Sequence, residues 1–154
     1  MELHECKQVI NELLVDIFND ILKLEHKTIE GLAGNALTMS EMHILEAIGN
    51  NPNAQMSDIA RKLRITLPTL TVSVQRLEDK GFITRQRHGS DRRKVTAELT
   101  ETGRMAYDHH AQYHEQMMEA LFSKLDLDKM PVLMDSMSML RDFFKSQADQ
   151  LYKD

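Results

Sequence analysis

The sequence is poor in several residues and patterns that mark whole classes of protein. Its 154 residues include one cysteine, three prolines, six glycines and no tryptophan. The lone Cys6 excludes a disulfide framework, and no apolar run approaches the roughly 18 residues of a membrane helix. Charged residues interrupt the first 15 positions, which therefore do not resemble a signal peptide. We expect a cytoplasmic protein that does not enter a membrane.

Sequence motifs for catalysis are also missing. The chain contains no glycine-rich phosphate loop and no G-x-S-x-G nucleophile turn. His88 and Asp91 share a short segment but have no nucleophile beside them to activate. We therefore do not expect an enzyme.

Basic residues are concentrated in the middle of an otherwise acidic chain. Between Met56 and Lys94, ten Lys or Arg and four acids give a local charge of +6, while the whole chain carries −5 and the remainder therefore −11. Because phosphate attraction is screened beyond about 8–10 Å, a local basic surface can bind nucleic acid even on an acidic protein. A solvated charged face is the alternative that charge alone leaves open.

Apolar spacing predicts two helices in the first third of the chain. Apolar residues recur every three or four positions over residues 2–30, which predicts one long amphipathic helix ending near Gly31. After a loop, Thr38 and Glu41 have the form of a capping box, which opens a second helix over residues 40–48.

The next segments have the form of a helix-turn-helix. A helix of barely two turns over residues 56–63 is followed by a short turn and a second helix over residues 66–80. Thr66 is expected to cap the second helix, Pro68 fits its first turn, and Gly81 suits its end. The outward face of this second helix would enter a groove of DNA.

A basic hairpin is expected directly after these helices. Residues 82–87 and 94–99 alternate like two short β-strands joined by residues 88–93. A hairpin in this position is a wing, whose Arg92 and Arg93 can reach a minor groove or flanking phosphates. The residues expected to contact DNA are Thr66, Pro68, Thr69, Thr71, Ser73, Gln75, Arg76, Arg87, Ser90, Asp91 (as a brace for a neighbouring Arg), Arg92 and Arg93.

The last third returns to helix. Thr100 can cap a helix that reaches about residue 124, and Asp128 can cap another over residues 129–152. The long first helix and these two helices carry more apolar surface than a small winged helix can cover, so we expect a homodimer. The expected fold is mainly α with a small β-hairpin, with residues 1–37 and 101–154 forming a dimerisation domain around a winged helix-turn-helix at 38–100.

The MarR family of winged helix-turn-helix transcription regulators resembles this chain over essentially its whole length. The similar segments are 56-MSDIARKL-63, 68-PTLTVSVQRLEDKGFITR-85 and 91-DRRKVTAELTETG-103, the last of which fits the family's D-x-R…L-T-x-x-G wing signature. The resemblance implies an obligate dimer that binds a pseudo-palindromic sequence in double-stranded DNA. It also implies that the protein acts as a repressor. It places Arg93 in a minor groove and the start of the 66–80 helix in a major groove. Val72 departs from the pattern, because many members carry Arg there.

Two branches of the family suggest different effectors. The segments 69-TLTVSVQRLEDKGFITRQR-87, 41-EMH-43 and 110-HAQYHEQM-117 resemble the FabT-type repressors of fatty-acid biosynthesis, whose co-repressor is an acyl group on acyl carrier protein. The eleven methionines fit an acyl tunnel, because thioether side chains adapt to an alkyl chain, but they fit ordinary core packing as well.

Histidines suggest the second effector, zinc. His110 and His114 are spaced i, i+4 on one helix face and could share a Zn²⁺ ion, given at least one further donor. Glu25 and His43 are candidate donors, and the four positions are similar to the ligand set of the branch that represses zinc uptake. Histidines satisfied by hydrogen bonds are the alternative. No cofactor is needed for the fold itself.

Three other hypotheses stay open. A small phenolic molecule could be the effector, and a reactive Cys6 would make an oxidant sensor, although no cationic cluster or partner cysteine accompanies it. A protein–protein adaptor that keeps the winged-helix fold without binding DNA is the alternative from another functional class.

Overall fold

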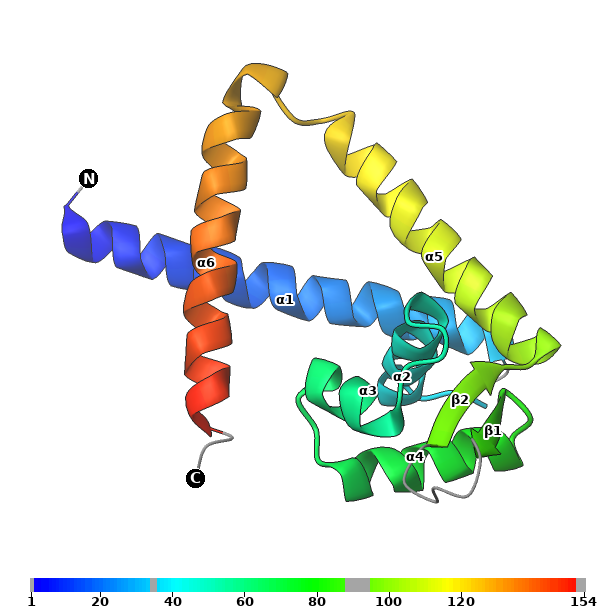
Figure 1. Ribbon diagram of the computed structural model, residues 1–154. Coiled ribbons are helices and arrows are strands. Elements are labelled where there is room, and N and C mark those ends of the chain that lie inside the picture. Colours follow the sequence, from blue (N-terminus) through cyan, green and yellow to red (C-terminus); the bar gives the residue numbers. More distant parts are fainter. Residues whose placement is uncertain (1, 34–35, 88–94, 152–154) are drawn as a thin grey trace. The chain divides into compact units, whose positions relative to one another are not determined.

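The structure is a computed structural model that describes residues 2–33, 36–87 and 95–151. It is mainly helical with a two-stranded antiparallel hairpin (Figure 1). The elements follow the chain as α1 (Leu3–Ala33), α2 (Met39–Asn50), α3 (Met56–Leu63), α4 (Leu67–Asp79), β1 (Ile83–Arg87), β2 (Val95–Leu99), α5 (Glu101–Phe122), the 3₁₀ turn η1 (Leu127–Lys129) and α6 (Met130–Leu151).

The chain forms two compact units, Met1–Ala111 and Gln112–Asp154. The first unit contains a hydrophobic core that α2, α3, α4 and the hairpin share, and five of its side chains are completely inaccessible to solvent. These are Met42, Leu45, Leu70, Val74 and Leu77. The core also includes Ile59 from α3 and Ile83 and Ala97 from the hairpin, so its burial holds the helix-turn-helix and the hairpin together.

Local sequence signals account for the way α2 begins. Thr38 accepts a hydrogen bond from the Glu41 backbone N–H at 3.2 Å, and the Glu41 carboxylate accepts one from the Thr38 N–H at 2.9 Å. This reciprocal pair confirms the capping box expected from the sequence.

Helix α1 contributes to the core only near its end, where Ile29 and Glu25 are buried. Its earlier turns reach past α2 (Figure 1) and leave most apolar side chains exposed. The helix continues through Gly31 to Ala33, two residues beyond the glycine near which the sequence predicted its end. Packing of Ile29 against the core offsets the cost of about 0.5–1 kcal/mol that glycine brings to a helix.

The second unit consists of the end of α5, η1 and α6. Asp126 caps η1 by accepting a hydrogen bond from the Asp128 backbone N–H at 3.1 Å, and α6 then starts directly at Met130. The assignment of Asp128 as the helix cap was therefore wrong, because Asp128 lies inside the 3₁₀ turn. None of the described residues from 112 to 151 is buried.

None of the helices in the described ranges combines the length and the apolar character needed to cross a membrane.

Candidate nucleic-acid interface

The turn between α3 and α4 brings two short helices together. Arg64 ends α3 in the left-handed conformation (φ 55°, ψ 42°), and its backbone N–H bonds back to the last carbonyls of that helix. Ala60 is buried in α3, which packs against α4, and its small side chain permits a close crossing of the two helices. The helix-turn-helix expected from the sequence is therefore present.

The start of α4 is fixed by its cap. The Thr66 hydroxyl accepts a hydrogen bond from the Thr69 backbone N–H at 3.2 Å, and the Thr66 and Thr69 hydroxyl oxygens lie 2.8 Å apart. Pro68 occupies the first turn, where its missing N–H leaves no hydrogen bond unmade. These contacts confirm Thr66 as the N-cap and hold the run TLTVSV in a helix despite its β-branched residues.

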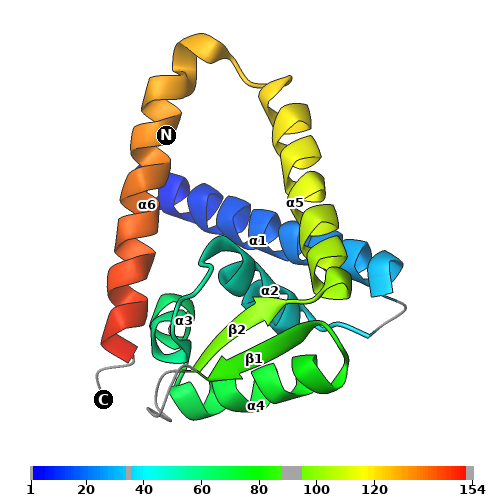
Figure 2. The same ribbon diagram turned by 45° about the vertical axis from the view of Figure 1, so that its right-hand side comes forward.

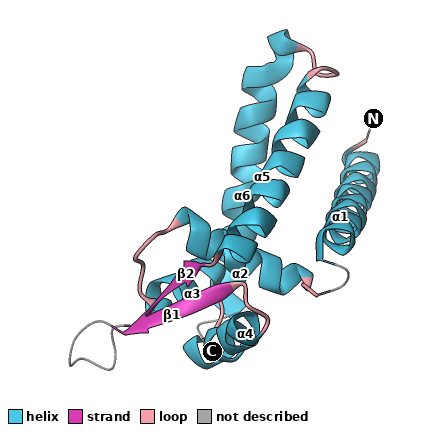
Figure 3. Ribbon diagram, turned by 90° about the vertical axis from the view of Figure 1, so that its right-hand side faces the viewer, coloured by secondary structure: helices cyan, strands magenta, loops and turns pink. Residues whose placement is uncertain are grey.

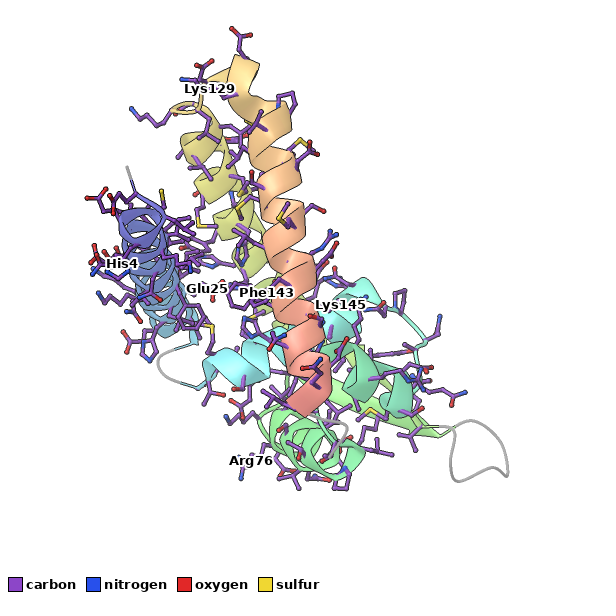
Figure 4. All side chains as sticks on the ribbon, turned by 90° about the vertical axis from the view of Figure 1, so that its left-hand side faces the viewer. His4, Glu25, Arg76, Lys129, Phe143 and Lys145 are labelled. Atoms are coloured by element: carbon purple, nitrogen blue, oxygen red, sulfur yellow. The ribbon has the colours of Figure 1, made fainter. Side chains whose placement is uncertain are left out.

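Helix α4 has one buried and one exposed face. Leu70, Val74 and Leu77 point into the core, and the outward side chains include Arg76, which Figure 4 shows projecting from the outer side of α4. Among the residues expected to contact DNA, Thr66, Pro68, Thr69, Thr71, Gln75 and Arg76 are exposed and Ser73 is half-buried.

Several polar groups on the exposed face are already bonded within the protein. The Thr71 hydroxyl donates to the Leu67 carbonyl at 2.8 Å. The Gln75 side-chain amide donates to Asp79 at 2.8 Å, and its oxygen accepts from the Arg85 guanidinium. A base contact from Gln75 would thus have to replace a bond inside the protein.

The hairpin follows α4 directly and pairs Ile83 with Leu99 at its base and Arg87 with Val95 at its end (Figure 2). Gly81 makes the turn into β1 with φ +80°, a conformation that glycine adopts at no steric cost, as its place after the helix suggested. Gln55 and Thr96 form an isolated antiparallel bridge. This bridge joins β2 to the start of α3.

An ion pair that the sequence did not reveal anchors β1 on α4. The Arg85 side chain donates to Glu78 Oε2 through Nε at 2.8 Å and Nη2 at 2.5 Å, and the Arg85 backbone N–H donates to Glu78 Oε1 at 3.1 Å. The side-chain bond from Arg85 holds the pKa of Glu78 below its ordinary value, and this effect exceeds the opposing effect of burial. Arg85 thus belongs to the framework, although it contributes to the basic island of the sequence.

The remaining expected DNA contacts fall on the segment that connects β1 to β2, and on the end of β1. Ser90, Asp91, Arg92 and Arg93 lie outside the described residues, as does the side chain of Arg87. Figure 3 shows the two strands, β1 and β2, in magenta.

A second ion pair ties the end of α4 to the start of α2. Lys80 Nζ lies 2.8 Å from both carboxylate oxygens of Glu41, a residue that is only 5% exposed. Burial alone would raise the pKa of Glu41, but the hydrogen bonds from Lys80 and Thr38 outweigh it and hold the pKa below its ordinary value of 4.5. The pair therefore positions α4 relative to α2.

Close backbone packing joins the hairpin to α5. Thr100 accepts a hydrogen bond from the Gly103 N–H at 3.1 Å, which confirms it as the cap of α5, and donates one to the Gly81 carbonyl at 2.6 Å. A Cβ on Gly103 would lie 1.9 Å from the Phe82 carbonyl oxygen. Only glycine fits here.

Helices α1, α2 and α5 carry a group of histidines and carboxylates. Glu25 and His110 are buried and offer ligand atoms within 4.8 Å of each other. His114 stands one turn after His110 on the same continuous helix, so the helix itself puts both imidazoles on one side. One carboxylate and two imidazoles form a donor set that suits Zn²⁺, and these three residues could hold a metal ion.

Two further residues, His43 and Glu46 on α2, each lie close to one member of this group. His43 Nε2, on the fourth expected ligand, lies 3.8 Å from Glu25 Oε2. Glu46, which sequence reasoning missed, places Oε1 3.4 Å from His110 Nε2. Glu46 follows His43 by three positions on α2, and that i, i+3 spacing was the only signal available in the sequence.

The chain is similar to known proteins in both sequence and structure. The model of the MarR family matches residues 37–95. Streptococcus pneumoniae FabT, solved in complex with DNA, is 33% identical, and its superposition covers 92% of this chain and 99% of FabT with a TM-score of 0.86.

Two curated relatives from Bacillus subtilis match over a shorter region. The HTH-type transcriptional repressor YetL is 28% identical over 116 residues, which make up 74% of this chain and 65% of YetL. The uncharacterized HTH-type transcriptional regulator YhjH is 27% identical over 104 residues, or 68% of this chain and 59% of YhjH. The matched region therefore spans less than two thirds of the length of either relative.

Proposed function

The chain belongs to the MarR family of winged helix-turn-helix regulators, and on this premise we propose that it is a sequence-specific DNA-binding transcriptional repressor. One observation carries the proposal: a protein that is 33% identical over nearly the whole chain was solved in complex with DNA. The winged-helix framework and the basic island between Met56 and Lys94 support it. Such a function takes place in the cytoplasm, the location expected from the sequence.

The proposed contacts divide between two grooves. The start of α4 enters the major groove, with Thr66, Pro68 and Thr69 at the DNA and Arg76 further along the exposed face. Arg92 and Arg93 at the wing tip enter a minor groove, which an A·T-rich sequence would narrow and make more attractive to cations. Recognition would then combine base contacts in one groove with shape and charge in the other.

The repressor acts as a homodimer on a pseudo-palindromic operator. Helix α1 exposes ten large apolar side chains, and the unit from Gln112 to Asp154 has no buried residue within its described part. Figure 4 marks Phe143 on α6, one of the exposed apolar residues of that unit. Apolar surface of this extent is typical of a subunit interface. A second copy of the chain would cover it, with residues 1–37 and 101–154 as the dimerisation domain.

Selection of bound sequences from a random duplex pool tests this proposal. We expect an enriched pseudo-palindrome whose affinity falls about 10³-fold or more between 50 and 200 mM salt, the loss typical of six or more phosphate contacts. Arg93→Ala should weaken binding to the selected duplex. Lys129→Ala is the matched control, since Lys129 is a highly exposed cation outside the winged helix. No enriched duplex, or binding independent of salt, would leave the protein–protein adaptor as the better hypothesis.

The effector that we favour is an acyl group carried on acyl carrier protein. The similarity to FabT supports it, together with exposed methionines on α5 and α6 that can adapt to an alkyl chain. These methionines are Met105, Met118, Met134, Met137 and Met139. In the binding assay, a long-chain acyl conjugate should change operator affinity at a concentration where the unacylated carrier does not. Equal effects of the two would exclude this effector.

Zinc is the second candidate effector, because Glu25, His110 and His114 could hold a metal ion. When bound, zinc would link two helices through these donors. Elemental analysis of the purified protein should show bound zinc, and His114→Ala should abolish it while leaving the helical circular dichroism unchanged, since His114 is only half-buried. Unchanged zinc content in that variant would show that the three residues do not form a metal site.

A further inference from the structure

Val72 occupies the centre of the exposed face of α4. It stands two residues from both Leu70 and Val74, whose side chains are completely buried, and at 3.6 residues per turn it therefore points almost opposite to the core. Its side chain is 53% exposed. The residues around it on the helix surface, at i±3 and i±4, are Pro68, Thr69, Gln75 and Arg76.

Helix stability does not explain a valine at this position. β-Branched residues are poor helix formers because their χ1 angle is restricted, and an exposed site in a helix favours Ala, Glu or Lys. The same restriction leaves the two valine methyl groups in a nearly fixed orientation. A fixed apolar surface loses little conformational entropy when a ligand covers it.

The neighbours of Val72 strengthen the apolar character of this surface. The hydroxyls of Thr69 and Thr71 are bonded to Thr66 and to the Leu67 carbonyl, and a Thr side chain engaged through its oxygen still carries a methyl group. Leu67 itself is 45% exposed at the beginning of the helix. The exposed face of the first two turns of α4 therefore includes apolar groups, from Leu67, Val72 and the threonine methyls.

DNA offers one apolar group in the major groove, the 5-methyl group of thymine. We propose that Val72 determines specificity by packing against a thymine methyl group in each half of the operator. This inference rests on the proposed DNA-binding function and deepens it. Arg76, one turn further along the same face, provides positive charge beside that contact.

The test uses the selected operator and replaces each thymine in turn by deoxyuridine, which removes the methyl group and leaves base pairing intact. One thymine per half-site should be sensitive, with binding weakened about fourfold for one half-site and about 15-fold for both, the loss that corresponds to ~0.8 kcal/mol per buried methyl group. Val72→Ala should bind the thymine and deoxyuridine operators with nearly equal affinity. Arg76→Ala should weaken binding to both operators but keep the ratio between them.

The possible outcomes separate this inference from the proposed function. Methyl sensitivity that disappears only in Val72→Ala supports it. A wild-type protein that binds the operator without sensitivity at any thymine, or with the same sensitivity in Val72→Ala, overturns it and leaves the DNA-binding function in place. A protein that binds no duplex refutes both. Misfolding is not expected to interfere, because Val72 lies on the exposed face.

Discussion

The ion pair between Lys80 and Glu41 provides a direct test of how α4 is held against α2. Lys80 caps the C-terminal end of α4, and Glu41 lies in the first turn of α2. Lys80→Met removes the cation but keeps a side chain of similar length. We expect the variant to be less stable, because Glu41 is then left as a buried carboxylate that, among the described residues, keeps its capping-box bonds with Thr38 but has lost its cation.

The magnitude follows from the geometry of the pair. Lys80 Nζ lies 2.8 Å from each Glu41 oxygen, and a hydrogen bond to a charged group contributes about 1.5–3 kcal/mol. Breaking a fully buried ion pair costs about 3–5 kcal/mol, but the Lys80 side chain is 36% exposed, so water can replace part of the interaction. We therefore expect the free energy of unfolding to fall by about 2 kcal/mol.

Urea unfolding followed by circular dichroism at pH 7 measures this loss, at one fixed protein concentration because the proposed dimerisation would make stability depend on concentration. Glu41→Gln is the informative partner, since glutamine can still accept the Thr38 bond and leaves no buried charge. The double variant should be only slightly less stable than Glu41→Gln alone. Additive losses in the double variant, or a loss below about 0.5 kcal/mol in Lys80→Met, would refute the reasoning.

Acid provides a second measurement on the same pair. The pKa of Glu41 lies below its ordinary value of 4.5 in the folded protein, so the stability that its charge contributes is present above pH 4.5 and is lost as the pH falls through the lowered pKa. The difference in stability between wild type and Lys80→Met should therefore be largest above pH 4.5 and decrease in more acidic solution. A difference that stays constant from neutral pH into that range would contradict the assignment.

Three further predictions concern the framework of the winged helix. Gly103→Ala should lower the free energy of unfolding by about 2–3 kcal/mol, because the added Cβ would lie 1.9 Å from the Phe82 carbonyl oxygen. Gly31→Ala is the control, since a Cβ there would have nothing within 4 Å. In the same denaturation assay it should leave stability unchanged or raise it by about 0.5 kcal/mol. Thr66→Ala should cost about 1 kcal/mol through loss of the α4 cap, and an unchanged urea midpoint would contradict that role. Arg85→Ala should lower thermal stability, and Arg85→Lys should recover only part of it, because lysine lacks the guanidinium fork that holds Glu78; full recovery would mean that charge alone matters.

Local sequence predicted most of the elements, because caps and periodicity act over a few residues. The ends of these elements depend on near neighbours in the chain. Capping hydrogen bonds within three residues begin helices at Thr38, Thr66 and Thr100, and a positive φ makes the turn after α4 at Gly81. The prediction failed at the start of the last helix, where the sequence offers two candidate capping residues. Asp126 and Asp128 are both acids ahead of a helix, and the choice between them depends on whether a 3₁₀ turn comes first.

The pairing of distant charges could not be predicted. Lys80 and Glu41 are 39 positions apart, and Arg85 and Glu78 are seven apart across a turn. In the sequence, Lys80 and Arg85 both belong to the basic island between Met56 and Lys94. In the folded chain, Lys80 holds α4 against α2, and Arg85 holds the hairpin against α4. Their distances from the carboxylates depend on how the elements pack, which no local rule contains.

The sequence by itself determined the class of this protein: the order of helix, turn, helix and basic hairpin, the ends of those elements, and the excess of apolar surface on the terminal helices. These properties follow from short-range hydrogen bonding and from the spacing of apolar residues, so they can be read along the chain. Only the tertiary structure decided that Lys80 and Arg85 pair with carboxylates of the framework. It also decided that Glu46 stands beside His110, and that Val72 faces outward while Thr71 and Gln75 are bonded within the protein. Each of these depends on side chains brought together by packing of the core, and packing is a property of the whole fold.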